Sequence, residues 1–168
     1  MLQTGEVAPD FELPGTTVDR IDAHSLSEYT DRGWAVVLTF YPFDFHPACV
    51  SQWCALRDAE WLTLLDDVVV LGVGTDSAYS HVEFATEYNL QFALLSDNDG
   101  SVSEAYDVLS AEFEGHRRVP QRAIFVVGPH DREIRYAWVA DDPADEPDMD
   151  AIRAATTDEG IAGEEPSA

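Results

Sequence analysis

The chain has 168 residues, 45% of them hydrophobic, and its 33 acidic residues against nine basic ones give a formal net charge of −24. The length suits one domain, and the apolar fraction supports a buried core without disulfide bridges. The charge excludes nucleic acid as an expected partner. The chain also lacks an apolar run of ~20 residues and a secretory signal, so we expect a cytoplasmic protein with no membrane partner.

All nine basic residues are arginine, and the acidic residues are spread along the whole chain. This distribution indicates a solvation property of the entire surface rather than one binding site. We hypothesise adaptation to a very salty, halophilic cytoplasm, where screening removes most of the self-repulsion. Equal stability at low and at molar KCl would contradict this hypothesis.

The first half of the chain predicts two buried strands and two helices. Residues 34–41 form a continuous apolar run rich in β-branched side chains, typical of a strand covered on both faces, and residues 68–73 have the same character. Between them, apolar side chains at spacings near three and four predict a helix from Cys49 to Leu65. A second amphipathic helix is expected over residues 82–88, ending near Asn89.

The second half predicts a short helix, a hairpin and a last helix. Residues 101–108 follow the turn sequence Asp-Asn-Asp-Gly and are expected to be helical. The apolar run at residues 123–127, a Gly-Pro turn and residues 133–139 predict an antiparallel hairpin. Residues 147–155 can form a final helix with Pro147 in its first turn.

This order of elements predicts an α/β fold with a mixed central β-sheet flanked by helices in a single domain. We place the domain at residues 3–157. The acidic tail at residues 158–168 is expected to be disordered.

Two cysteines, Cys49 and Cys54, lie five positions apart, which is not the C-x-x-C spacing of a thioredoxin-type dithiol. Two thiols in an intracellular protein are more often redox-active than structural. Cys49 follows a buried strand and two prolines and opens a predicted helix. There, unpaired backbone N–H groups and the helix dipole are expected to lower the pKa of its thiol below the free value of ~8.5.

The segment around Cys49 resembles a known family. Pro42-x-x-x-His46-x-x-Cys49 is similar to the peroxiredoxin signature of proline, three residues, threonine or serine, two residues and cysteine. The resemblance covers about residues 3–140. It includes an opening strand at residues 5–13, the middle segments around Asp76-Ser77 and at residues 90–97, and the strand at residues 121–127. Cys54 makes the chain most similar to the bacterioferritin comigratory protein or Q-type subgroup.

The resemblance implies a thioredoxin-like fold and a thiol peroxidase that acts in antioxidant defence without metal or other cofactor. Cys49 would attack a hydrogen peroxide or organic hydroperoxide and become a sulfenic acid. Pro42 would shield it, and Arg122 would hold the thiolate and the peroxide. Cys54 would then form a disulfide with Cys49, which a thioredoxin-like dithiol reduces. Such a protein would be a monomer or a homodimer.

His46 departs from the family pattern, because threonine or serine usually stands at this position. An imidazole can donate and accept hydrogen bonds, but it is larger than a hydroxyl and titrates near neutral pH. His46 therefore leaves an alternative open: a thiol-based redox sensor or binding module on the same fold with weakened turnover. No role is assigned to the four scattered histidines, which are His24, His81, His116 and His130.

Helix geometry constrains the disulfide. Five residues of α-helix rise roughly 7.5 Å and rotate about 140°, and Cα atoms more than ~7 Å apart cannot be bridged. If Cys49 and Cys54 share one helix, it must therefore unwind locally in each turnover. The same divergence disfavours a metal site made by both cysteines and His46, a third interpretation.

Overall fold

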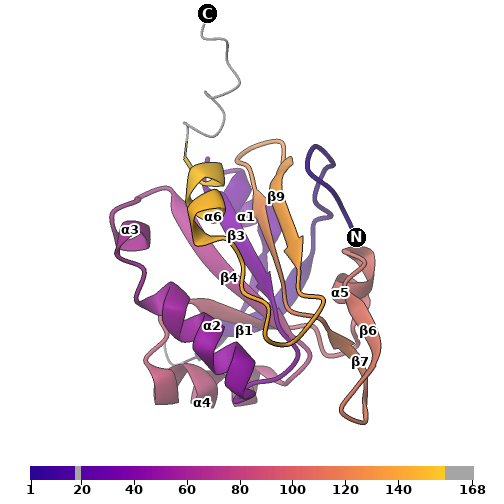
Figure 1. The fold of residues 1–168 in the computed structure, drawn as a ribbon. Helices are drawn as coiled ribbons and strands as arrows, with labels where there is room; N and C mark the ends of the chain where they lie inside the picture. The colour runs from indigo at the N-terminus through magenta and orange to yellow at the C-terminus, as the bar shows by residue number, and fades with distance from the viewer. Residues whose placement is uncertain (18–19, 158–168) are drawn as a thin grey trace, which may run out of the picture.

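A seven-stranded mixed sheet organises the computed structural model, which describes residues 1–17 and 20–157 (Figure 1). In space the strands follow the order β2-β1-β5-β4-β3-β8-β9. β3, β4 and β5 are parallel, while β8 and β9 add antiparallel strands on one side and β1 and β2 on the other. The strand bounds are β1 Glu12–Thr17, β2 Arg20–Ser25, β3 Ala35–Phe40, β4 Val68–Gly74, β5 Ala93–Ser96, β8 Ala123–Val127 and β9 Ile134–Val139. The predicted mixed α/β sheet is confirmed.

The two faces of the sheet carry separate apolar cores, because consecutive side chains of a strand point to opposite faces. In β3, Val36 and Leu38 belong to one core and Val37 to the other. Helices cover both faces, as Figure 1 shows. Their bounds are α1 Leu26–Thr30, α2 Pro47–Arg57, α3 Glu60–Thr63, α4 Ala78–Tyr88, α5 Ser101–Ala105 and α6 Met149–Ala155. None of the described helices is long and apolar enough to cross a membrane.

Helix α2 is fixed to the sheet by Trp53, whose side chain is fully buried. Its ring lies over Gly72 of β4, where an added Cβ would come within 2.5 Å of the indole. The ring also meets Tyr41 edge-on, with 5.4 Å between the centroids. Because Gly72 has no side chain, the turn of α2 that carries Trp53 can approach the sheet closely.

The predicted helix from Cys49 to Leu65 is wrong in its second half. Helix α2 ends at Arg57, and Ala59 is extended before the separate short helix α3. The Arg57 side chain binds Asp58 directly after the helix, at 2.9 and 3.0 Å. Leu64, which the periodicity places on the apolar face, is exposed. The spacing of apolar residues alone does not reveal a short interruption between two helices.

Other boundaries also differ from the predictions. The opening strand begins at Glu12 rather than at residue 5, and residues 5–11 contribute only an isolated bridge between Val7 and Glu133. Helix α5 stops at Ala105, since Asp107 adopts a positive φ of 58°. Helix α6 begins at Met149 because the Asp148 side chain caps it.

Four strands were not predicted, namely β2, β5 and the separate hairpin of β6 (Leu109–Phe113) and β7 (His116–Pro120). The strands at 35–40, 68–74, 123–127 and 134–139 and the helix ending before Asn89 are confirmed. The expected tail at residues 158–168 lies outside the described residues.

Candidate functional site

Strand β3 and helix α2 present Cys49. The loop between them carries Pro42 and ends at His46, the N-cap of α2, and Cys49 lies in the first turn of the helix. Its side chain is 1% exposed, and the backbone N–H of Phe43 donates a hydrogen bond to its sulfur. The predicted strand-to-helix placement of the thiol is therefore confirmed.

The predicted lowering of its pKa is wrong for this conformation. Burial raises the pKa of the Cys49 thiol to about 11. The hydrogen bond from Phe43 and the charge of Arg122 oppose this rise, whereas the carboxylates of Asp44 and Asp76 add to it. The sequence shows the helix terminus but not how deeply the thiol is buried, and burial is the larger effect.

Arg122 precedes β8 and is 7% exposed. Its Nε and Nη2 donate to Oε1 of Gln52 at 3.0 and 2.6 Å, and its Nη1 donates to the carbonyls of Pro143 and Asp145 at 2.8 Å each. These bonds use four of the five N–H donors of a guanidinium. One Nη2 hydrogen is left without a hydrogen-bond partner among the described residues. Arg122 is close enough to act on Cys49 by charge, but no hydrogen bond joins the two.

Gln52 is a site residue that the sequence reading missed. It lies three positions after Cys49, hence about one turn further along the same face of α2. Its side chain is buried and orients Arg122, while its own Nε2 has no hydrogen-bond partner among the described residues. Its position three residues after Cys49 on a predicted helix was the signal in the sequence that could have identified it.

His46 occupies the position where the family has a hydroxyl. Its Nδ1 accepts a hydrogen bond from the backbone N–H of Ala48 at 3.2 Å, so this nitrogen carries no proton. Its Nε2 faces the Glu114 carboxylate at 3.7 Å. The ring packs against Phe43 of the same loop and against Phe113 of the β6–β7 hairpin, and these two phenylalanines also stack on each other. His46 therefore caps the helix and contacts the hairpin.

A cavity of about 190 Å³ adjoins these groups. Pro42, His46 and Arg122 all contribute to its wall, so the structure brings together three of the five predicted site residues around one opening. The rest of the wall is formed by Ser110, Phe113, Pro120, Gln121, Ala140, Asp141, Asp142 and Pro143.

Cys54, the fifth predicted residue, lies on the same helix as Cys49. Both thiols are free, and Cys54 is partly exposed. Because α2 is continuous from Pro47 to Arg57, helix geometry separates the two Cα atoms by a rise of about 7.5 Å along the axis and by roughly 8.7 Å in space. A disulfide between them requires local unwinding. Among the described residues, no three His, Cys, Asp or Glu side chains gather in a way that could hold a metal ion.

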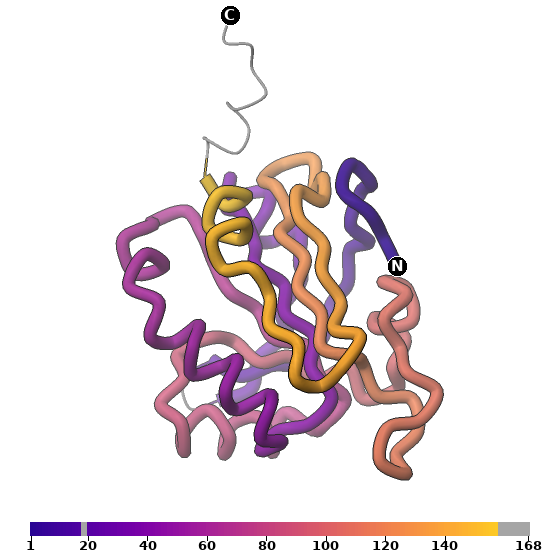
Figure 2. The backbone as a smooth tube through the Cα atoms, viewed as in Figure 1, coloured from indigo at the N-terminus to yellow at the C-terminus, as the bar shows by residue number. Residues whose placement is uncertain are grey.

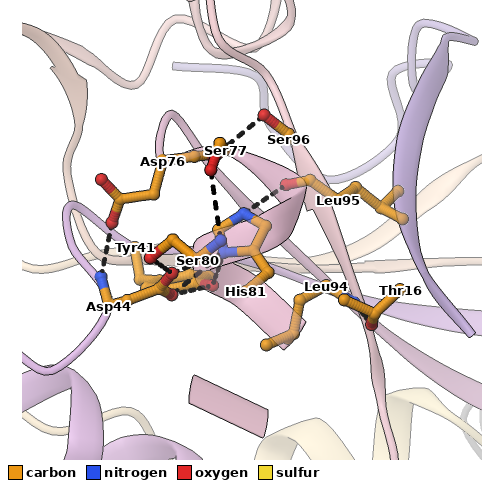
Figure 3. A network of polar contacts seen from close by, with 10 residues as sticks. All are labelled: Thr16, Tyr41, Asp44, Asp76, Ser77, Ser80, His81, Leu94, Leu95 and Ser96. Atoms are coloured by element: carbon orange, nitrogen blue, oxygen red, sulfur yellow. Dashed lines mark hydrogen bonds and ion pairs between the residues drawn. The ribbon is translucent and has the colours of Figure 1, made fainter. Parts of the chain in front are cut away.

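A buried polar network lies behind the loop (Figure 3). Nδ1 of His81 is 2.8 Å from a carboxylate oxygen of Asp44, and its Nε2 is 3.1 Å from the carbonyl of Leu95. The His81 ring therefore bridges a buried carboxylate of the loop and a backbone carbonyl of β5. The hydroxyls of Tyr41 and Ser80 donate to the same carboxylate at 2.8 and 2.7 Å.

The network fixes the loop that carries the signature. The Asp44 backbone N–H donates to the Asp76 carboxylate at 2.8 Å, which ties the loop to the end of β4. Burial raises the pKa of Asp76, and the charge of Asp44 adds to the rise. Next in the loop, Phe45 has a φ of 71°, a strained conformation for an aromatic residue. The sequence reading assigned no role to His81, which contacts Asp44 only through the tertiary fold.

Residues 4–137 match the model of the AhpC/TSA family. The chain belongs to that family. It is 35% identical over 136 residues to "Peroxiredoxin Bcp" of Bacillus subtilis, with 80% of this chain and 83% of the relative covered. It is 41% identical over 109 residues to "Putative peroxiredoxin bcp" of Coxiella burnetii, covering 64% and 68%. The reduced 2-Cys peroxiredoxin of Plasmodium vivax superposes with a TM-score of 0.80 at 26% identity, covering 98% and 84%.

The protein is therefore a peroxiredoxin-family thiol peroxidase with a thioredoxin-like fold, an enzyme class that uses a peroxide as substrate and a thiol as reductant. Its two cysteines are consistent with the intrasubunit disulfide mechanism of the Bcp and Q-type subgroup.

Proposed function

We propose that Cys49 is the peroxidatic residue of this peroxiredoxin. Its thiolate attacks one oxygen of the peroxide, the O–O bond breaks, and the second oxygen leaves as water or an alcohol after taking up a proton. Cys49 is thereby oxidised to a sulfenic acid. The observation that carries the proposal is the placement of Cys49 in the first turn of α2, where it accepts a bond from Phe43 beside a cavity walled by Pro42 and Arg122.

Arg122 and Pro42 support this step in different ways. The unused Nη2 hydrogen of Arg122 can donate to the thiolate or to the peroxide, while Gln52 keeps the guanidinium in place. Pro42 is buried and walls the cavity on the side of the loop. Since the thiol has a pKa of about 11 in this conformation, a small shift of Arg122 toward the sulfur would favour the reactive thiolate.

Cys54 is the resolving residue in this proposal. It attacks the Cys49 sulfenic acid, releases water and leaves a disulfide, which a thioredoxin-like dithiol then reduces. Cys54 is partly exposed and lies about 7.5 Å along α2 from Cys49, so the first turns of the helix unwind during this step. Far-UV CD that stays unchanged while the disulfide forms would contradict the unwinding.

A redox sensor is the second candidate, and two observations favour it. The pKa of the Cys49 thiol is raised to about 11, and His46 uses Nδ1 to cap α2 instead of offering a hydroxyl to the peroxide. A sensor would be oxidised stoichiometrically and would turn over slowly with a thioredoxin-like reductant.

The decisive experiment is a hydrogen peroxide titration of the reduced protein beside Cys49→Ser and Cys54→Ser. We expect the wild type to lose both thiols at about one equivalent, and Cys54→Ser to accumulate a sulfenic acid that a dimedone probe traps. Steady-state turnover with a thioredoxin system then separates the peroxidase from the sensor. Thiols that react no faster than a free cysteine would overturn both.

Several predictions from the sequence remain open to experiment. These are the domain bounds at residues 3–157, the cytoplasmic localisation, a monomer or homodimer, the lack of nucleic acid and membrane partners, and the halophilic interpretation of the charge of −24. A stability series in KCl tests the halophilic interpretation, and size-exclusion chromatography tests the oligomeric state.

A further inference from the structure

Arg122 lies beneath an acidic segment, residues 141–147, which we call the strap. The strap follows β9 and leads to α6, and it is the loop of orange to yellow tube between these elements in Figure 2. Its carbonyls at Pro143 and Asp145 hold Nη1 of Arg122. It also organises itself, because the Asp145 carboxylate accepts the backbone N–H groups of Asp141 and Asp142 at 2.9 and 3.0 Å.

The strap brings carboxylates to the opening of the cavity. Asp141 and Asp142 are exposed and belong to the cavity wall. On the opposite hairpin, Glu114 faces the ring of His46. Asp145 and Glu146 lie close enough to Arg122 to act on its charge. Arg122 is the one arginine in the wall, and its charge acts on Cys49 as well as on the nearby acids.

The interior of the cavity has a different character. Most of the surface area of its wall is apolar, and Pro42, Phe113, Pro120, Ala140 and Pro143 contribute to it. Its volume of about 190 Å³ is several times the roughly 30 Å³ that a water molecule occupies in the liquid. The space therefore exceeds what hydrogen peroxide needs, and its walls suit the hydrocarbon part of an organic hydroperoxide.

We propose that the strap selects peroxide substrates by charge: uncharged hydroperoxides with an apolar body enter readily, and peroxides that carry a negative charge are repelled. The proposal rests on the proposed peroxidase function of Cys49 and deepens it. The strap lies beyond residues 4–137, the part that matches the family model. The chemical step is unchanged, since the thiolate takes one peroxide oxygen and the alcohol leaves.

Salt controls the strength of this selection. Interactions between exposed charges are screened over ~10 Å at 0.1 M ionic strength and over ~3 Å at 1 M. Repulsion of an anionic substrate should therefore be strong in dilute buffer and weak in molar salt, while entry of an uncharged peroxide should respond little.

The test compares cumene hydroperoxide with its para-carboxylate derivative, two substrates that differ by one negative charge. Stopped-flow measurement of thiol loss gives each rate constant relative to that of hydrogen peroxide. At low ionic strength we expect the uncharged substrate to react about fivefold or more faster, and the difference to fall below about twofold at 1 M salt. Asp141→Asn/Asp142→Asn should narrow the difference in rate at low salt, because it removes two negative charges from the cavity wall. The strap should keep its conformation, since asparagine retains the acceptor oxygen that Asp142 offers to the backbone N–H of Ala144.

Asp66→Asn/Asp67→Asn is the matched control. It changes the net charge equally at two exposed residues before β4, at the opposite end of the parallel strands from the loop after β3, and should leave the preference intact. Equal reactivity of the two hydroperoxides with the wild type at low salt would overturn the proposal. An unchanged preference in Asp141→Asn/Asp142→Asn would also overturn it. Failure of the wild type to consume hydrogen peroxide would instead overturn the peroxidase role of Cys49, and the selection with it.

Discussion

Two histidine–carboxylate pairs hold the two sides of the Cys49 loop, and they differ in almost every physical respect. His81 and Asp44 are 2.8 Å apart, with side chains 0% and 1% exposed. His46 and Glu114 are 3.7 Å apart, with side chains 15% and 63% exposed. The inner pair is desolvated and satisfied by Tyr41 and Ser80, whereas water and salt reach the outer pair. Burial therefore makes the inner pair a structural anchor and leaves the outer contact adjustable.

The largest effect is expected from Asp44→Ala. Removing the carboxylate takes away the buried partner of His81, Tyr41 and Ser80, and breaking a buried ion pair of this kind costs roughly 3–5 kcal/mol. Urea denaturation should show this loss in the free energy of unfolding. A loss below about 1 kcal/mol would mean that His81 is neutral in the folded protein.

Gln52→Leu should have the next largest effect. It removes the acceptor of Nε and Nη2 of the buried Arg122 and should destabilise the protein by about 1–3 kcal/mol. If Gln52 also positions Arg122 for the reaction, the rate of Cys49 oxidation falls, while Gln52→Glu retains an acceptor and restores the rate. A stability loss with an unchanged oxidation rate would limit Gln52 to a structural role.

Cys49 itself predicts a pH effect on stability. Its folded pKa of about 11 is above its ordinary value of 9.0, so the neutral thiol favours the folded state below pH 9. That contribution is lost as the pH rises from about 9 to about 11, and at pH 10 the loss is about 1 kcal/mol. We expect unfolding experiments at pH 7 and pH 10 to show a larger drop for the wild type than for Cys49→Ser. Parallel drops would show that the thiol is not desolvated.

The smallest effect is expected from Glu114→Gln, the outer counterpart of Asp44→Ala. Glu114 is largely exposed and its contact with His46 is long, so the free energy of unfolding should change by less than about 0.5 kcal/mol. Thermal unfolding at low and high salt measures this change. A loss comparable to that of Asp44→Ala would remove the distinction between the two pairs.

The sequence predicted where the site residues lie better than it predicted the groups that support them. Pro42, His46, Cys49 and Arg122 belong to motifs that can be read from short segments, and the structure gathers them as expected. Asp44 and His81 are 37 residues apart, and only the packing of α4 against the loop shows that they pair.

The rise in the pKa of Cys49 and the strap's contacts with Arg122 depend likewise on burial and on distant segments. Gln52 is the exception among the missed residues, because helical spacing from Cys49 was enough to find it.

Trp53 divides α2 into two parts. Its ring packs against Gly72 and Tyr41, and Cys54 is the next residue, so in the proposed mechanism Cys54 would stay with the sheet while the turn that carries Cys49 moves out to meet it. The oxidised and reduced proteins then differ in shape at one end of a single helix. A reductant that recognises the displaced turn would bind the disulfide form and leave the reduced form, so product release would follow directly from the refolding of that turn.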